Sequence, residues 1–348
     1  MMTCDINSTT SVKVSKPVPK SNVAISVAMS VYNGAAYLPL AIESILDQSF
    51  ADFEFLILND GSTDTSAAII DAYAARDPRI RAIHRENCGL IVSLNQLIAE
   101  ARAPIIARMD GDDIAMPDRF AEQYAFLTTN PDYGVVSSWT VDIDGDGKPF
   151  PIAGNDHPTN FEDFLSAIED GPLLCHPSAM FRRDLVLGVG GYHAAFRHCE
   201  DYDLWLRLAG VTKLCSLPKR LMQYRHTDSQ VSNRHVVEQQ IGVAASRFAY
   251  RERMAGRPDP TESLAALPPL EDYDQLFGRS GATAEARAMV ASGILYSQVA
   301  MKGEGFDLLM AHVKDAKPIP GLQRTILRLL RFGEPVRAAR LAAALLFR

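Results

Sequence analysis

Between Val23 and Ile114, short apolar runs of strand length alternate with amphipathic segments of helical period, and this alternation constrains the fold more than any other feature. The four strand-like runs lie at residues 23–31, 53–58, 79–84 and 104–109. Strands that alternate with helices at this spacing indicate βαβ units and a parallel sheet covered on both faces. The sequence therefore predicts an α/β fold in which ligands bind beyond the carboxyl ends of the strands.

After Ile114 the alternation loosens and the predicted elements become more varied. Pro117 suits the first turn of a helix, which we expect over residues 117–129. Residues 135–148 have the pattern of a β-hairpin, and residues 201–208 that of a helix with an apolar inner face. This part of the chain therefore extends the fold beyond simple βαβ units.

A proline-rich stretch over residues 256–270 predicts a linker, and the chain beyond it has only helical patterns. The polar N-terminus has the composition of a flexible tail. We therefore expect three parts. They are the tail (residues 1–22), one domain (residues 23–255) with halves at about 23–115 and 116–255, and a linker with a helical C-terminal region (residues 256–348).

Composition excludes several classes of protein. The chain has 348 residues, 47% of them hydrophobic, and a formal net charge of −7, which argues against general disorder and against a nucleic-acid binder with a basic surface. Its five cysteines are widely spaced without a CxxC pair, which favours free thiols in a reducing compartment. The N-terminus lacks the apolar core of a signal peptide, and no apolar stretch reaches the ~18 residues of a membrane span. We expect a cytoplasmic protein, at most peripheral to a membrane.

The strongest candidate for chemistry is the run Met109-Asp110-Gly111-Asp112-Asp113, which follows the fourth predicted strand. Three carboxylates in one loop repel one another unless a cation joins them. Mg²⁺ and Mn²⁺ are bound by one or two carboxylates together with phosphate oxygens, which a nucleotide diphosphate would supply. The alternative is an acidic surface turn, and the buried strand before the loop favours the metal site.

Two other acidic segments admit both a functional and a structural interpretation. Asp60 follows the second predicted strand, where it could accept a hydrogen bond from a nucleobase or ribose, but its segment also suits a turn and a helix cap. Glu200 and Asp201 begin a predicted helix, where the helix dipole stabilises acids and where one of them could act as a general base. Local chemistry leaves both questions open.

The sequence argues against several other kinds of metal, nucleotide and catalytic site. The run Asp142–Gly147 begins like an EF-hand loop, but its twelfth position is Ala153 instead of a bidentate acid, so a hairpin turn is favoured. The eight histidines show no spacing typical of a zinc site. Neither a Walker A loop nor a GxSxG elbow is present in the sequence.

A series of motifs runs in order through residues 24–235. These motifs are Ile25–Asn33, Leu46–Phe50, Phe53–Asp64, Asn87–Leu90, Asn95, Ile106–Asp113, Pro117–Arg119, His176–Arg182, Gly190–Tyr192 and Glu200–Arg207. Together they resemble glycosyltransferase family 2 on the GT-A fold of nucleotide-diphospho-sugar transferases. The resemblance implies a Rossmann-like, mostly parallel sheet flanked by helices, with a nucleotide-binding half before an acceptor half and a helical C-terminal appendix.

The resemblance also implies a nucleotide pocket at the carboxyl ends of the first strands. Asp60 resembles the acid that contacts the base of the nucleotide. Ser30, Tyr32 and Asn33 resemble the wall of the same pocket. The donor implied is a UDP-, GDP- or dTDP-linked sugar.

For catalysis, the resemblance implies a bound metal ion and a general base. Asp110 and Asp112, with Gly111 between them, resemble the DxD motif that holds Mn²⁺ or Mg²⁺ on the sugar-nucleotide diphosphate, with Asp112 as the direct ligand. Asp201 resembles the catalytic base. The reaction implied is a displacement at the anomeric carbon with inversion, in which the base takes the proton of an acceptor hydroxyl.

The type of transferase is also implied. The Gln-x-x-Arg-Trp motif of processive synthases is absent from the sequence, as are their membrane spans, which favours an enzyme of hexosyltransferase type that adds a single sugar. The acceptor implied is a saccharide or a lipid-linked saccharide in cell-surface polysaccharide or glycolipid biosynthesis. The alternatives are a catalytically inactive GT-A-like scaffold and a metal-dependent phosphohydrolase.

The chain departs from the family pattern at two positions. Asn59 replaces the first acid of the usual Asp-Asp-Gly-Ser, so only Asp60 supplies a carboxylate there. The family's closing histidine position falls on Thr227, with His226 one residue early. The resemblance therefore assigns no definite role to His226.

The C-terminal residues 322–348 have a basic character that the rest of the chain lacks, with six arginines and one glutamate. Arg324, Arg328 and Arg331 recur at helical spacing, with leucines on another face. Such a helix could lie on an anionic membrane. It could equally be a packed terminal helix or a homodimer contact, and both interpretations stay open.

Overall fold

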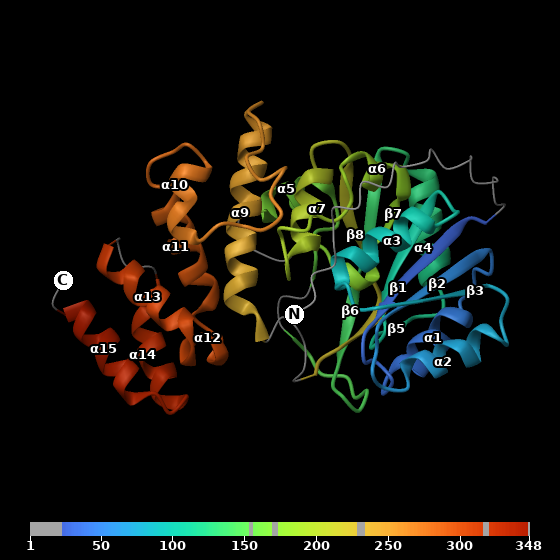
Figure 1. The fold of residues 1–348 in the computed structure, drawn as a ribbon, viewed down its shortest axis with the longest axis horizontal. Coiled ribbons are helices and arrows are strands. Elements are labelled where there is room, and N and C mark those ends of the chain that lie inside the picture. Colours follow the sequence, from blue (N-terminus) through green and yellow to red (C-terminus); the bar gives the residue numbers. More distant parts are fainter. Residues whose placement is uncertain (1–22, 153–155, 169–172, 228–233, 316–319, 347–348) are drawn as a thin grey trace. The chain divides into compact units, whose positions relative to one another are not determined.

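The computed structural model describes residues 23–152, 156–168, 173–227, 234–315 and 320–346, and its internal contacts divide the chain into two compact units (Figure 1). The first unit contains the residues up to Tyr192 together with Val211–His226. The second contains His193–Gly210 and the residues from Thr227 onward. The tail expected at residues 1–22 lies outside the described residues, and the domain boundaries stay a prediction.

An eight-stranded sheet forms the core of the first unit, in the order β3-β2-β1-β4-β7-β6-β8-β5. The strands are β1 (Ile25–Val31), β2 (Phe53–Asp60), β3 (Ile80–Arg85), β4 (Ile105–Asp110), β5 (Ile114–Ala115), β6 (Tyr133–Ile143), β7 (Met180–Arg182) and β8 (Lys213–Arg225). Strands β3, β2, β1 and β4 are parallel neighbours, whereas β7 is antiparallel to both β4 and β6. Strand β8 is parallel to β6 and antiparallel to β5. The four strands predicted first along the chain are confirmed.

Helices cover this sheet because their apolar residues recur on one face. Leu38, Ala41, Ile42 and Ile45 of α1 are buried, and every residue of β2 is buried, as expected for a strand covered on both sides. The helices of the first unit are α1 (Leu38–Leu46), α2 (Ser66–Ala74), α3 (Leu90–Glu100), α4 (Arg119–Thr129), α5 (Phe161–Ala167), η1 (His176–Ser178) and α6 (Arg183–Gly188). The helix predicted after Pro117 is confirmed as α4.

The hairpin predicted over residues 135–148 is wrong. The structure has one long strand, β6, which pairs along its length with β8 and at two residues with β7, and the chain folds back on it only at its end. The acidic run does form a turn, closed by the N–H of Gly147 on the carbonyl of Asp144, but only one isolated bridge, Ile143 to Pro149, follows it. The local Asp-Gly signal therefore identified the turn, whereas the strand pairing was decided by contacts distant in sequence.

The second unit is helical among its described residues. Its helices are α7 (Glu200–Leu208), α9 (Val236–Met254), η2 (Leu270–Asp272), α10 (Tyr273–Leu276), α11 (Ala282–Ile294), α12 (Gln298–Lys302), α13 (Glu304–Asp315), α14 (Leu322–Arg331) and α15 (Pro335–Leu346). This confirms the predicted helix near residues 201–208 and the helical C-terminal region. The proline-rich stretch from Gly256 to Pro269 has turns but no helix or strand.

The C-terminal helices α14 and α15 bury part of their apolar faces. Leu322 and Leu329 of α14 and Leu341 of α15 are buried. Leu327 and Leu330 are 59% and 51% exposed. This packing favours the packed-helix interpretation for the buried face, and contact with a membrane stays a prediction.

Among the described helices, none combines the length and the apolar character needed to cross a bilayer. The four described cysteines, Cys88, Cys175, Cys199 and Cys215, are free thiols, as the sequence predicted.

Candidate active site

The carboxyl ends of β1, β2 and β4 lie at one edge of the sheet in the first unit. Strand β1 is the middle strand of the three, and its Ser30 is in register with Leu58 of β2 and with Asp110 of β4. Since the three strands are parallel, the loops that leave them share this edge. The structure therefore brings together the loops that carry the predicted nucleotide-binding and metal-binding residues.

Asp60 lies at the end of β2 and is 2% exposed. Its Oδ1 accepts the Nε–H of Arg85 at 2.9 Å and the N–H of Cys88 at 3.0 Å, and its Oδ2 accepts the N–H of Gly89 at 2.8 Å. Arg85 Nη2 also lies 2.9 Å from Asp60 Oδ1, so the carboxylate forms an ion pair with this arginine. Asp60 thus fixes the β3–α3 loop at the end of β2.

The loop after β1 is held by the loop after β2. Asn33 has a left-handed φ of 53°, which asparagine tolerates better than most residues. Its N–H donates to Ser62 Oγ at 2.9 Å, and its Oδ1 accepts the N–H of Thr63 at 2.8 Å. Tyr32, the residue before it, is 56% exposed. The backbone is fixed while the Tyr32 ring stays available to a ligand.

The acidic loop after β4 gathers its three carboxylates. Asp110, Asp112 and Asp113 each place an oxygen within 4.8 Å of the others. Burial, and then the charge of Asp110, raise the pKa of Asp112 to about 6. Burial, followed by the charges of Asp112 and Asp110, raises the pKa of Asp113 well above its ordinary value. Such mutual repulsion among oxygen donors suits a bound divalent cation, so the donor set fits Mg²⁺ or Mn²⁺.

Two buried arginines hold the acidic loop, and neither role is evident in the sequence. Arg108, on β4, pairs with Asp110 and is only 3% exposed. Arg225, at the end of β8, donates from Nε to the carbonyl of Asp112 at 2.7 Å, and its N–H donates to Asp113 Oδ1 at 2.8 Å. Arg108 could have been noticed in the sequence only as a charged residue inside an apolar strand. No feature of the sequence near Arg225 indicates its contact with residues more than 100 positions earlier.

Replacing Arg225 by methionine should lower the free energy of unfolding by about 2–4 kcal/mol. The buried guanidinium also donates to the carbonyls of Asp144 and Gly145, at 3.1 and 3.2 Å, and the substitution leaves these acceptors without their donor. Urea denaturation measures the change. The matched control is Lys219→Met on the same strand, because the exposed ion pair of Lys219 with Glu122 contributes at most about 1 kcal/mol. Equal losses in the two variants would contradict the clamping role of Arg225.

His226 ends the first unit and hydrogen-bonds an acid of β6. Its Nε2 is 2.7 Å from Asp142 Oδ1, and its ring makes edge contacts with Phe150 and Tyr224. Asp142, which the sequence placed at the start of an EF-hand-like run, is thus a partner of His226. Residues 228–233, which follow His226 and Thr227, lie outside the described residues.

Asp201 belongs to the second unit, where it lies in the first turn of α7 with Glu200 and Asp203. Asp203 is 1% exposed and bonded to Arg207 at 2.7 and 2.9 Å, and Glu200 is 6% exposed. Asp201 is half-buried, and its Oδ1 accepts the N–H of Tyr202 at 2.8 Å. Of the three acids, Asp201 is the one most accessible to an acceptor.

Comparison with known proteins agrees with this arrangement. The model of the family "Glycosyl transferase family 2" matches residues 26–189. The O-antigen biosynthesis glycosyltransferase WbnJ of Escherichia coli is 34% identical over 185 residues, which are 53% of this chain and 71% of WbnJ. The putative glycosyltransferase EpsE of Bacillus subtilis is 36% identical over 192 residues, which are 54% of this chain and 67% of EpsE.

Two solved structures share the fold. S. aureus TarS 1–349 in complex with UDP-GlcNAc superposes with a TM-score of 0.56 at 15% identity, covering 92% of this chain and 90% of that one. The mannosyltransferase PcManGT from Pyrobaculum calidifontis, in complex with GDP-Man and Mn²⁺, superposes with a TM-score of 0.51 at 16% identity, covering 95% of this chain and 88% of the other. These similarities confirm the predicted GT-A fold.

Proposed function

Since this chain belongs to glycosyltransferase family 2 and is a glycosyltransferase, we propose that it transfers a single sugar from a nucleotide-diphospho-sugar to an acceptor hydroxyl, with inversion at the anomeric carbon. The observation that carries the proposal is the shared edge of β1, β2 and β4, where the loops of Asn33, Asp60 and Asp110 meet. An edge of this kind is where open α/β sheets bind nucleotides.

The nucleotide of the donor binds along this edge. Asp60, which is held by Arg85, Cys88 and Gly89, would accept an N–H of a base or a ribose hydroxyl. The exposed ring of Tyr32 offers a stacking surface to the base. Ser30 and the fixed Asn33 loop form the wall between them.

Asp110 and Asp112 would hold a divalent cation, Mn²⁺ or Mg²⁺, with Asp112 as the direct ligand and Gly111 giving the diphosphate close access to the loop. When bound, the ion offsets the negative charge of the diphosphate as it leaves. Arg108 and Arg225 hold the loop so that its carboxylates converge. The Mn²⁺ in the structure of PcManGT supports this assignment by analogy of fold.

Asp201 would act as the general base. In the reaction its carboxylate takes the proton of the acceptor hydroxyl while that oxygen attacks the anomeric carbon from the face opposite the diphosphate. One displacement of this kind inverts the configuration. Asp201 suits the role because it is half-buried in the first turn of α7, whereas Asp203 is buried and bonded to Arg207.

The acceptor is a saccharide or lipid-linked saccharide of a cell-surface polysaccharide or glycolipid. WbnJ, named for O-antigen biosynthesis, supports this class. Leu327 and Leu330, exposed on the arginine-rich helix α14, would favour contact of a cytoplasmic enzyme with an anionic membrane that carries such an acceptor.

A panel of nucleotide sugars tests the proposal. The full chain is incubated with UDP-, GDP- and dTDP-linked hexoses in the presence of Mn²⁺ or Mg²⁺, and nucleotide binding and release of nucleoside diphosphate are measured. We expect one nucleotide class to bind and to be hydrolysed slowly without acceptor. Binding without turnover, with or without oligosaccharide acceptors, would favour a scaffold, and release of phosphate from simple phosphate esters would favour a phosphohydrolase.

A further inference from the structure

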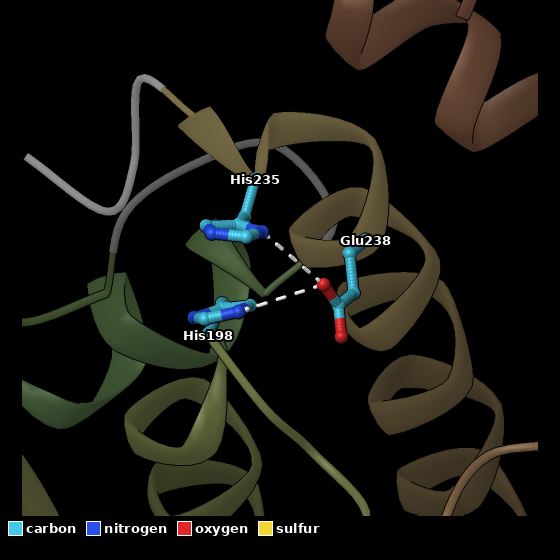
Figure 2. A group of neighbouring side chains, drawn as sticks. All are labelled: His198, His235 and Glu238. Atoms are coloured by element: carbon cyan, nitrogen blue, oxygen red, sulfur yellow. Dashed lines mark ion pairs between the residues drawn. The ribbon is translucent and has the colours of Figure 1, made fainter. Parts of the chain in front are cut away.

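Two histidines and a glutamate converge in the second unit, and none of them belongs to the candidate active site (Figure 2). His198 precedes α7, His235 is the N-cap residue immediately before α9, and Glu238 lies in the first turn of α9. Glu238 Oε2 is 3.5 Å from His198 Nε2 and 3.4 Å from His235 Nδ1. Figure 2 shows both rings directed toward this one oxygen.

The backbone and the ring contacts hold His198 in this position. Its φ of 67° is left-handed, which is uncommon for a residue other than glycine. Gln239 donates from Nε2 to the carbonyl of His198 at 3.0 Å. The rings of His198 and His235 are stacked, with centroids 4.1 Å apart and planes inclined by 17°. An uncommon backbone conformation is thus maintained at a residue whose ring faces a carboxylate.

The polar contacts within the described residues do not account for this convergence. His198 Nε2 is buried and has no hydrogen-bond partner among them. Both rings nevertheless face the same carboxylate oxygen of Glu238. The separations of 3.4 and 3.5 Å are also longer than charge-assisted hydrogen bonds, which are ~2.7–2.9 Å.

The same separations fit a metal. Ligand atoms at ~2.0–2.1 Å from a tetrahedral Zn²⁺ are about 3.3 Å from one another, close to the 3.4 and 3.5 Å found here. Two imidazoles and one carboxylate are a donor set that zinc takes, with its fourth position open to water. Because the two rings are stacked and inclined by only 17°, one of them would turn on binding so that both nitrogens face the ion. The three aspartates of the first unit offer only oxygen, which hard ions prefer.

We propose that His198, His235 and Glu238 form a zinc site that ties the start of α7 to the start of α9. The site is distinct from the Asp110–Asp113 loop in its ligands and in the metal that it selects. His198 precedes Asp201 by three positions, so the bound ion would fix the chain that enters the helix of the proposed base. The histidines are positioning residues in this scheme, and zinc binding itself does not depend on the proposed function.

Zinc binding is tested on the full chain carrying Asp110→Asn and Asp112→Asn, which removes competition from the acidic loop. After chelation and dialysis, ZnCl₂ is titrated by calorimetry, with metal content checked by elemental analysis. We expect one Zn²⁺ per chain and a higher Tm. His198→Asn, which tolerates the left-handed backbone, and His235→Gln and Glu238→Gln should each weaken binding by about 10–100-fold or more.

The matched control is His193→Gln in the same unit, because the ring of His193 contacts the carbonyl of Glu262 and no carboxylate in the described residues. It should keep the full affinity for zinc. Co²⁺ provides a second readout, since a tetrahedral nitrogen-oxygen site absorbs visible light far more strongly than an octahedral oxygen site. The proposal is overturned if micromolar ZnCl₂ does not bind, or if His235→Gln and Glu238→Gln bind as tightly as the control. These readouts use no activity, so they are independent of whether the chain transfers sugar.

Discussion

Replacing Asp201 by asparagine should lower kcat for sugar transfer by about 10²–10⁴-fold, while the affinity for the donor nucleotide stays close to that of the unmodified enzyme. Asparagine has nearly the same shape, and its Oδ1 can still accept the N–H of Tyr202, so the start of α7 is retained. What is lost is the ability to take a proton from the acceptor hydroxyl. Transfer to acceptor and nucleotide binding, measured separately, check the two halves of the prediction.

Asp184→Asn is the matched control for this substitution. Asp184 also lies in the first turn of a helix, α6, and its side chain is 92% exposed. It should leave both kcat and the Kd of the nucleotide unchanged. If Asp201→Asn keeps its full rate, Asp201 is not the base, and Glu200 becomes the next residue to test. If transfer and nucleotide binding fall together, the substitution has disturbed the fold instead of the chemistry.

The first half of the sheet could be predicted from the sequence because its information is local. Strands β1 to β4 are short runs of six to eight residues, mostly apolar in β1, β2 and β4, each followed by polar residues, and helices separate the first four strands, so period and length suffice. Strand β6 could not be predicted in this way. Its residues also suit a hairpin, and only its pairing with β8, about 80 residues later, makes it a single long strand.

The same difference between local and distant contacts separates the site residues that could be predicted from those that could not. The acidic loop was visible because its carboxylates are adjacent in sequence and follow a buried strand. Arg225 was not visible, because its link to the carbonyl of Asp112 spans 113 positions. The same limit applies to His198, whose partners His235 and Glu238 come from another helix, so a search for histidine spacing along the chain could not find the cluster. Asp60 was identified by its place at the end of the second strand, but its bond to Arg85 requires the paired strands.

A substitution in the acidic loop should also have a large effect on activity. Replacing Asp112 by asparagine should weaken binding of Mn²⁺ in the presence of nucleotide by at least about 100-fold and abolish transfer at ordinary metal concentrations. An amide keeps the shape of the side chain but removes one of the negative charges that make this loop attractive to a cation. Chelation of the unmodified enzyme should have the same effect, reversed by adding Mn²⁺ or Mg²⁺. Turnover as a function of metal concentration measures both.

Asp146→Asn is the control for Asp112→Asn, because Asp146 lies in an equally acidic and glycine-containing turn but is exposed and donates its N–H to Asp144. It should leave the metal dependence of turnover unchanged. The fold of the Asp112 variant is expected to be retained or stabilised, since its side chain is one of three mutually repelling, buried or half-buried carboxylates. Loss of activity with an unchanged or higher Tm would therefore identify Asp112 as a metal ligand whose charge lowers the stability of the fold. Transfer that persists after chelation would remove the metal from the mechanism and leave Arg108 and Arg225 as the charges nearest to the loop.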